Sequence, residues 1–268
     1  MQNIKSLILD MDGVLWHGET PQPGIDKFFA RLDAISMPYV LATNNAMRVA
    51  SQYTEKLARF GVKVDPDQIL TSSEATASYI EHVHPTVETV YVVGESGLKR
   101  AMKAQGFKVI GPEQVRNGDS AEAVVAGLTR DSLTYELLAM GSRLLNEGSL
   151  FIATNVDATY PTETGPLPGA GAIVAVLEVS SGRSPIVIGK PNPHMFEEAL
   201  RRLGPAATGA AMVGDRLTTD IAGGNAAGIS TVLVLSGVST EEEIETSGIQ
   251  PTFVVRDITD LGEALANR

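Results

Sequence analysis

Short apolar runs rich in β-branched residues alternate with amphipathic stretches along most of the chain, and this alternation constrains the fold more than any other feature. The runs at 7–9 and 39–43 are separated by a stretch, 25–35, whose apolar positions recur with a helical period. A second helical stretch, 47–60, ends at Gly61, which suits a left-handed C-terminal cap. Repetition of strand and helix predicts right-handed βαβ units, a parallel sheet and an α/β fold.

The same rhythm restarts in the middle of the chain, with strands predicted at 90–94, 123–127, 150–154, 186–189, 212–214 and 232–235. These strands are too many for one sheet of typical size. Turn clusters at His84-Pro85 and at 181–185 are the best candidate boundaries. We therefore predict a first domain formed by 1–82 and 186–268, with a second α/β domain, 83–185, inserted into it.

Bulk properties narrow the classes of function. A formal net charge of -11 disfavours nucleic-acid binding, because such a chain gains little from phosphate-backbone contacts. No apolar stretch is long enough to span a bilayer, so we expect no membrane interaction. The apolar run at 6–9 is too short for a signal peptide, and the absence of cysteine points to a reducing setting. A cytoplasmic location is the expectation.

Polar residues directly follow four of the predicted strands. In an open α/β sheet, ligands bind beyond the carboxyl ends of the strands, so these positions are the candidates for a functional site. They form the clusters Asp10-Met-Asp12-Gly13, Thr43-Asn44-Asn45, Gly189-Lys190-Pro191 and the segment from Asp215 to Asp220.

Each cluster alone also has an ordinary structural explanation. Asp-x-Asp-Gly suits a turn, and Thr43 suits the N-terminal cap of a helix. A single Lys190 is commonly a solvated surface residue. Asp215 and Asp220 flank a helix start, where acidic residues complement the helix dipole.

Taken together, the clusters favour a site for phosphate chemistry. Carboxylates gathered at one sheet edge repel each other unless a hard cation lies among them, and Mg2+ prefers carboxylate and water oxygens. One lysine, a hydroxyl group and helix N-termini supply the donors that a phosphoryl group needs. Of Asp10 and Asp12, one can attack phosphorus while the other transfers the proton of the leaving group.

In this order the four clusters resemble the haloacid dehalogenase (HAD) superfamily of phosphohydrolases. The segments 150–157, 168–173, 189–193 and 213–220 resemble its p-nitrophenyl phosphatase or NagD-like branch. The resemblance implies a Rossmann-like parallel-sheet core with an inserted α/β cap domain of the larger, C2 type.

The resemblance also assigns roles to the first two clusters. Asp10 would be the nucleophile that forms an aspartyl-phosphate. Asp12 would protonate the leaving alcohol and then activate water. Thr43 and the Asn44 amide, with Asn45 beside them, would hold the phosphoryl oxygens.

The remaining clusters would balance and bind charge. Lys190 would neutralise the nucleophile and the phosphoryl group. The resemblance implies a Mg2+ site formed by Asp10, the backbone carbonyl of Asp12, Asp215 and Asp220, the last acting directly or through water.

Substrate choice is expected to depend on the inserted domain. Asn155, Asp157 and Tyr160 follow one of its predicted strands and resemble the segment that faces substrates in this branch, although an ordinary loop accounts equally for them. Arg216 either adds positive field for the substrate or is solvated. Trp16, just after the first cluster, either flanks the active-site entrance or packs in the core.

The expected function is a Mg2+-dependent phosphatase that hydrolyses small phosphate monoesters through an aspartyl-phosphate. Candidate substrates are nucleotides, sugar phosphates, pyridoxal phosphate, phosphoglycolate and p-nitrophenyl phosphate. Two alternatives are a phosphotransferase or phosphomutase with the same intermediate, and a non-catalytic receiver-like domain, which is typically half this length. A homodimer through the cap is a further expectation of the resemblance.

Overall fold

The computed structural model describes residues 1–162 and 165–267, which form two compact units. The first unit comprises Met1–Thr43, Ala50–Leu70 and Lys190–Arg268. The second comprises Asn44–Val49 and Thr71–Gly189. The second unit is therefore an insertion in the first, and each is described by itself.

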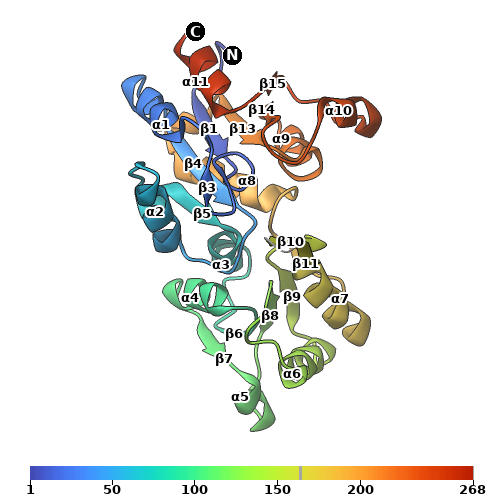
Figure 1. Cartoon of the computed structure of the whole chain (residues 1–268). Coiled ribbons are helices and arrows are strands. Elements are labelled where there is room, and N and C mark those ends of the chain that lie inside the picture. Colours follow the sequence, from blue (N-terminus) through green and yellow to red (C-terminus); the bar gives the residue numbers. More distant parts are fainter. Residues whose placement is uncertain (163–164, 268) are drawn as a thin grey trace. The chain divides into compact units, whose positions relative to one another are not determined.

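The first unit is built on a six-stranded sheet of order β15-β14-β13-β1-β4-β5 (Figure 1). Strand β1 pairs in parallel with β4 on one side and with β13 on the other, so that Leu9 lies opposite both Leu41 and Val213. From β1 the chain continues to β4 and β5 on one side, and its later strands, β13 to β15, lie on the other side. The strand order therefore reverses beside β1, which is the switch point of the winding. The strands are β1 (Ser6–Leu9), β4 (Tyr39–Thr43), β5 (Ile69–Thr71), β13 (Ala210–Gly214), β14 (Ser230–Val234) and β15 (Phe253–Val255).

Helices cover this sheet with the faces that their apolar spacing predicts. Helix α1 buries Ile25, Phe28, Phe29 and Leu32 in the core and packs against α11. Burial of each such side chain contributes about 1.5–3 kcal/mol. The helices are α1 (Ile25–Ala34), α2 (Ala50–Arg59), α8 (Pro193–Leu203), α9 (Ala222–Ala226), α10 (Glu241–Ser247) and α11 (Ile258–Ala266). A π-helical turn, Leu217–Ile221, precedes α9, and a hairpin, β2 (Trp16–His17) and β3 (Thr20–Pro21), follows β1.

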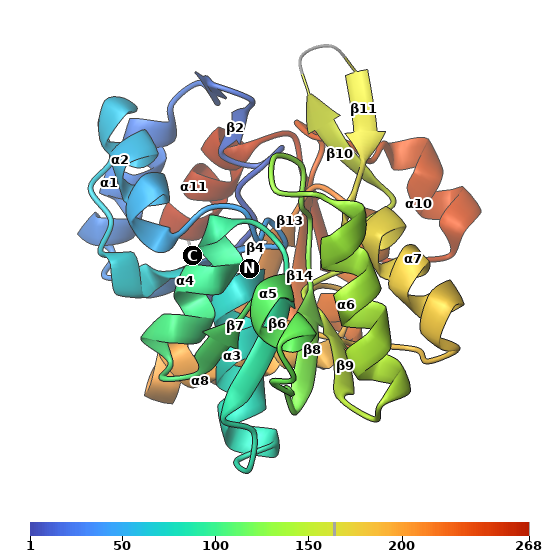
Figure 2. The ribbon, with the colours of Figure 1, turned by 90° about the horizontal axis from the view of Figure 1, so that it is seen from below.

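The second unit has its own parallel sheet, of order β12-β9-β8-β6-β7. Figure 2 shows α6 and α7 on one side of β8 and β9 and α4 on the other, and α3 packs against α4. The strands are β6 (Thr89–Val93), β7 (Lys108–Ile110), β8 (Ala123–Ala126), β9 (Leu150–Ala153) and β12 (Ile186–Val187). The helices are α3 (Ser72–Val83), α4 (Ser96–Ala104), α5 (Pro112–Arg116), α6 (Tyr135–Asn146) and α7 (Ala170–Ser181), and β10 (Thr159–Thr162) and β11 (Gly165–Pro168) form a hairpin.

The predicted α/β class is confirmed: both larger sheets are parallel where their register is defined, and the second forms a separate domain. The compact units divide at other points than the turn clusters. Helix α3 belongs to the second unit because it packs on α4, and β12 belongs there because Ile186 pairs with Ile152 of β9. The domain limits 1–82, 83–185 and 186–268 stay predictions. No helix of the described chain is long and apolar enough to cross a membrane.

Candidate active site

Asp10 and Lys190 meet at the carboxyl end of β1. Asp10 directly follows the strand and is 8% exposed, and its backbone N–H donates to the carbonyl of Val213 in β13. Lys190 is 4% exposed, and its Nζ donates to Asp10 Oδ1 at 2.5 Å and to the carbonyl oxygen of Ala42 at 3.2 Å. The ammonium group also lies 2.7 Å from Oδ1 of Asp220. One buried cation therefore bridges two carboxylates.

Asp215 completes an acidic cluster with Asp10 and Asp220. One carboxylate oxygen of each lies within 4.8 Å of the others, and all three residues are buried. Backbone donors orient two of them: the N–H of Val238 bonds Asp215 Oδ2 at 2.8 Å, and that of Arg216 bonds Asp220 Oδ2 at 3.1 Å. The structure thus places Asp10, after β1, and Asp215 and Asp220, after β13, close to Lys190 in the first unit.

Two glycines make room for the Asp215 carboxylate. A Cβ built on Gly13 would lie 2.3 Å from Asp215 Oδ2, and one on Gly237 would lie 2.2 Å from the same atom. Gly13 also has a φ of +91°, which side-chain-bearing residues rarely adopt. Gly237 was absent from the sequence-based candidates, because a glycine so far from the motif carries no local signal of this role.

The donor set fits a hard divalent cation. Asp215 Oδ1 is buried and has no hydrogen-bond partner in the described part of the chain. An ionised oxygen in that state is costly unless a cation satisfies it. The carboxylates of Asp10, Asp215 and Asp220 are the ligand type that Mg2+ prefers, and Lys190 pairs with two of these three carboxylates, those of Asp10 and Asp220.

Burial and like charges shift the ionisation of the cluster. Burial raises the pKa of Asp10 well above its ordinary value, and the charges of Asp220 and Asp215 add to the effect of burial, against the opposing ammonium of Lys190. Burial and the charge of Asp220 raise the pKa of Asp215 to about 6. Burial alone would lower the pKa of Lys190, but Asp10 and Asp220 raise it above its ordinary value. Without a metal the cluster therefore resists full ionisation.

Asp12 lies apart from the cluster. Its side chain is exposed, and its Oδ1 accepts a 2.7 Å hydrogen bond from the indole Nε1 of Trp16. The loop between Asp12 and Trp16 is a closed turn. The N–H of Leu15 donates to the carbonyl of Met11, and the N–H of Gly13 donates to the carbonyl of Trp16. The carboxylate of Asp12 is not among the clustered ligands; the expected metal contact through its backbone carbonyl stays a prediction.

The second motif lies at the end of β4. Thr43 is buried and ends that strand in the first unit, while Asn44 and Asn45 belong to the second unit. Helix α2 begins only at Ala50, so the alternative that Thr43 caps this helix is wrong. Asn45 instead closes a local turn, its Oδ1 accepting from the N–H of Met47 at 2.9 Å.

Within the second unit, the Asn44 segment bonds to the segment that follows β9. Asn155 Nδ2 donates to the Asn44 carbonyl at 2.7 Å, and Asn44 Nδ2 lies 3.3 Å from Asp157 Oδ1. Asn155 Oδ1 also accepts from the N–H of Asp157 at 3.1 Å. Asn155 and Asp157 therefore hold the backbone and the side chain of Asn44, so both have a structural role within the second unit.

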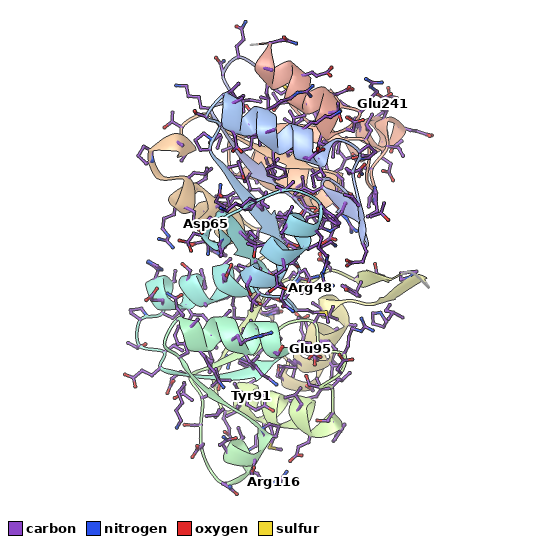
Figure 3. All side chains as sticks on the ribbon, turned by 60° about the vertical axis from the view of Figure 1, so that its left-hand side comes forward. Arg48, Asp65, Tyr91, Glu95, Arg116 and Glu241 are labelled. Atoms are coloured by element: carbon purple, nitrogen blue, oxygen red, sulfur yellow. The ribbon has the colours of Figure 1, made fainter. Side chains whose placement is uncertain are left out.

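Tyr160 has a cationic neighbour in the same unit. The Arg130 guanidinium lies 5.6 Å from the centre of its ring, within cation–π distance. The loop of Arg130 is held by Glu95, whose Oε1 accepts from the N–H groups of Arg130, Asp131 and Ser132. Figure 3 shows Glu95 at the same end of this unit as Arg48, opposite to Arg116. Neither Glu95 nor Arg130 was a sequence-based candidate.

Arg216, the remaining candidate, is partly buried beside the acidic cluster. It lines a cavity of about 350 Å³ between the π-helical turn and α10, and its charge opposes the rise in the pKa of Asp215. The charge of Arg216 thus acts on Asp215, and a contact of Arg216 with substrate stays a prediction.

Two family models match the chain. Residues 7–108 match a haloacid dehalogenase-like hydrolase model, and residues 187–261 match a HAD-hydrolase-like model. An acid sugar phosphatase from Staphylococcus epidermidis is 38% identical over 258 residues, which are 96% of each chain. The chain belongs to the haloacid dehalogenase-like hydrolases.

Solved structures of HAD hydrolases agree over almost the whole chain. A p-nitrophenyl phosphatase from Archaeoglobus fulgidus superposes with a TM-score of 0.88 and 35% identity, over 97% of this chain and 99% of that one. NagD from E. coli gives 0.87 and 32%, over 96% and 98%. A glycerol phosphate phosphatase from Mycobacterium tuberculosis in complex with magnesium gives 0.86 and 32%, over 97% and 77%. The predicted family, branch and enzyme class, a HAD-type phosphatase, are confirmed.

Proposed function

We propose that this HAD hydrolase is a Mg2+-dependent phosphatase of small phosphate monoesters, with Asp10 as its nucleophile. The observation that carries the proposal is the buried cluster of Asp10, Asp215 and Asp220 around Lys190, with one carboxylate oxygen left without a partner in the described chain. Such an arrangement binds a hard cation and a phosphoryl group together. A receiver-like domain does not accord with membership of a hydrolase family over the full length.

The residues divide the reaction into two displacements. A carboxylate oxygen of Asp10 attacks phosphorus while the bond from phosphorus to the leaving oxygen breaks, and Asp12 gives that oxygen its proton. Asp12 then takes a proton from water, whose oxygen attacks phosphorus and releases Asp10 and inorganic phosphate. Lys190 compensates the charge of Asp10 throughout.

Mg2+, held by Asp10, Asp215 and Asp220, supplies charge stabilisation for the transferred phosphoryl group when bound. Thr43, with Asn44 and Asn45 after it, is assigned to the phosphoryl oxygens. Roles for Asn155, Asp157, Tyr160 and Arg216 in substrate recognition stay predictions, as do a homodimer through the cap and a cytoplasmic setting.

Sugar phosphates are the first substrates to examine, because the similar staphylococcal enzyme is an acid sugar phosphatase. Nucleotides, pyridoxal phosphate, phosphoglycolate and p-nitrophenyl phosphate complete the panel. The test is release of inorganic phosphate with Mg2+, with Mn2+ and with chelator. Absence of turnover with both metals across the panel contradicts the proposal.

The nucleophile has its own test. Asp10→Asn is expected to abolish turnover while leaving the circular dichroism spectrum unchanged, because an amide oxygen does not attack phosphorus. Near-normal kcat in this variant contradicts the assignment. Adding alcohol acceptors separates hydrolysis from phosphotransfer: a phosphotransferase forms a new phosphate ester at the expense of inorganic phosphate.

A further inference from the structure

The Asp12 carboxylate depends on one side chain for its orientation. Its Oδ1 accepts from Trp16 Nε1 at 2.7 Å, and no other donor to this carboxylate exists within residues 1–162 and 165–267. Asp12 itself is exposed on a loop, where a carboxylate ordinarily samples several rotamers. A hydrogen bond from a fixed neighbour restricts that sampling and leaves Oδ2 available for a substrate.

Trp16 is fixed by its packing. The residue is 0% exposed, and its indole stacks on Tyr53 with ring centres 6.3 Å apart and planes 17° from parallel. Phe60 lies against the same indole at 6.1 Å. Because these rings come from α2 and its end, the direction of the indole N–H is set by the core of the first unit rather than by the loop of Asp12.

A buried cation lies on the face of the same ring. Lys56 Nζ is 4.3 Å from the indole centre, donates to the carbonyl of Gly18 and lies 3.6 Å from Glu19 Oε1. A cation over an aromatic face withdraws electron density from the ring. The indole N–H becomes a stronger donor in consequence, because the nearby positive charge of Lys56 polarises it.

We propose that Trp16 is the positioning residue for the general acid of this enzyme, holding the Asp12 carboxylate where it meets the leaving oxygen. The inference rests on the proposed phosphatase mechanism and adds to it a residue that neither touches the phosphoryl group nor belongs to the acidic cluster. A displacement of about 1 Å in a catalytic group costs on the order of 100-fold in rate. A hydrogen bond of this kind therefore acts on the rate far more than on the fold.

The leaving group distinguishes a positioning role from a merely structural one. An alkoxide leaves poorly and needs the proton of Asp12, whereas p-nitrophenolate leaves readily without it. The ratio kcat/KM reports the steps up to cleavage of the first phosphorus–oxygen bond, so it isolates the acid step. Loss of positioning lowers kcat/KM for alkyl phosphates much more than for aryl phosphates, while general damage lowers both alike.

Two replacements remove the N–H. Trp16→Phe shortens the ring system. Benzothienylalanine keeps the shape of the indole with sulfur in place of the N–H, and it can be introduced globally because Trp16 is the only tryptophan. For both we expect kcat/KM to fall about 10- to 100-fold with glycerol phosphate and less than about 3-fold with p-nitrophenyl phosphate. Equal losses on the two substrates in the isosteric protein overturn the proposal, even where Trp16→Phe fails to fold.

A matched control keeps the N–H and disturbs the packing. Phe60→Leu removes a ring that lies against Trp16, and any loss it causes should be the same for both substrates. Asp12→Asn should show the same substrate split as the Trp16 replacements, and adding Trp16→Phe to it should cost little more. If the fold-losses of kcat/KM in the two single variants multiply fully in the double variant, Trp16 and Asp12 act independently and the proposal is contradicted.

The hydrogen bond also has a readout independent of activity. A 15N-labelled protein gives a single indole N–H resonance, and Asp12→Asn is expected to move it by removing the charged acceptor. An unmoved resonance overturns the proposal directly. If the wild-type protein hydrolyses no phosphate monoester of the panel with either metal, the proposed function fails together with the positioning role. Turnover with an unchanged substrate ratio refutes the positioning role alone.

Discussion

Lys190 Nζ lies 2.5 Å from Asp10 Oδ1, although the two residues are 180 positions apart in the chain. The same ammonium group lies 2.7 Å from Asp220, so one cation serves two buried carboxylates. Buried ion pairs contribute little net stability, but removal of one partner leaves an uncompensated charge that costs about 3–5 kcal/mol. The ion pairs of Lys190 are therefore better explained by binding of an anionic substrate than by a gain in stability.

Replacing Lys190 should affect both activity and stability. Lys190→Met is expected to lower kcat about 100-fold or more, because the charge on Asp10 and the phosphoryl group loses its nearest cation. Its melting temperature should fall in chelator and recover in part with Mg2+. Lys63→Met, at an exposed position, is the matched control and should leave both unchanged. Thermal melts measure the effect on stability, and phosphate release measures the effect on kcat. A wild-type kcat in Lys190→Met contradicts the role assigned to Lys190.

The acidic cluster predicts an inverted pH dependence for the metal-free protein. The pKa of Asp215 is raised from an ordinary value of 3.8 to about 6. Between pH 3.8 and about pH 6 the folded state therefore binds more protons than the unfolded state. The contribution of Asp215 to the free energy of unfolding is largest below pH 3.8 and is lost as the pH rises through about 6. Mg2+ binds the ionised form and should stabilise the protein more at pH 7 than at pH 5.

The measurement is the melting temperature between pH 4 and pH 8, in chelator and in excess Mg2+. Asp215→Asn should flatten the metal-free profile and abolish most of the Mg2+ shift, because the amide does not ionise. A metal-free wild-type protein whose stability rises steadily across this window contradicts the prediction.

Gly237 should be intolerant of a side chain. In Gly237→Ala the new methyl group would meet Asp215 Oδ2 at 2.2 Å, so the carboxylate must move. We expect Mg2+ affinity to fall at least about 10-fold, which corresponds to about 1.4 kcal/mol, with a parallel loss of kcat. Gly111→Ala is the control, since its Cβ meets only Gln114 Oε1 at 3.4 Å. Calorimetric titration of Mg2+ decides the outcome; equal affinity in both variants refutes the steric account.

Glu95 should order the loop that carries Arg130. Burial would raise the pKa of Glu95, but the N–H groups of Arg130, Ser132 and Asp131 and the Thr129 hydroxyl hold it below its ordinary value. Glu95→Gln is expected to cost about 1 kcal/mol near neutral pH, since charge-assisted hydrogen bonds are stronger than neutral ones. The cost should vanish as pH falls below the ordinary carboxyl range, because the wild-type carboxylate is then protonated as well.

Hydrogen exchange of the segment 127–135 measures this loop directly. Its amides should exchange faster in Glu95→Gln than in the wild type at pH 7, with little change elsewhere in the second unit. Glu122→Gln is a suitable comparison, because Glu122 also accepts backbone N–H groups, those of Glu88 and Thr89, away from this loop. Uniform acceleration across the unit would indicate general destabilisation instead.

Several elements were predictable because their signals are local. The apolar spacing of 25–35 predicted α1. Thr71 with Glu74 forms a capping box that marks the start of α3, a helix that was not predicted although this signal is also local. The run at 186–189 was recognised as a strand, but its pairing with β9 was not predictable, since a two-residue strand carries no sign of its partner. Glu95 was not among the sequence-based candidates, because its contact with residues 130–132 depends on how two strand ends align.

By itself the sequence determined the alternation of strands and helices and the place of each acid at a strand end or in the turn that follows it, because hydrophobic periodicity and turn chemistry act over a few residues. The tertiary structure alone decided which of these side chains form ion pairs or hydrogen bonds with one another. Lys190 contacts Asp10 although 180 positions separate them in the chain. Gly237 leaves space for Asp215 because the turns that follow β14 and β13, two neighbouring strands, lie side by side. Trp16 is four residues from Asp12, yet its N–H points there only because α2 fixes the indole. Distances of a few tenths of an ångström decide such contacts, and packing of the whole first unit sets them.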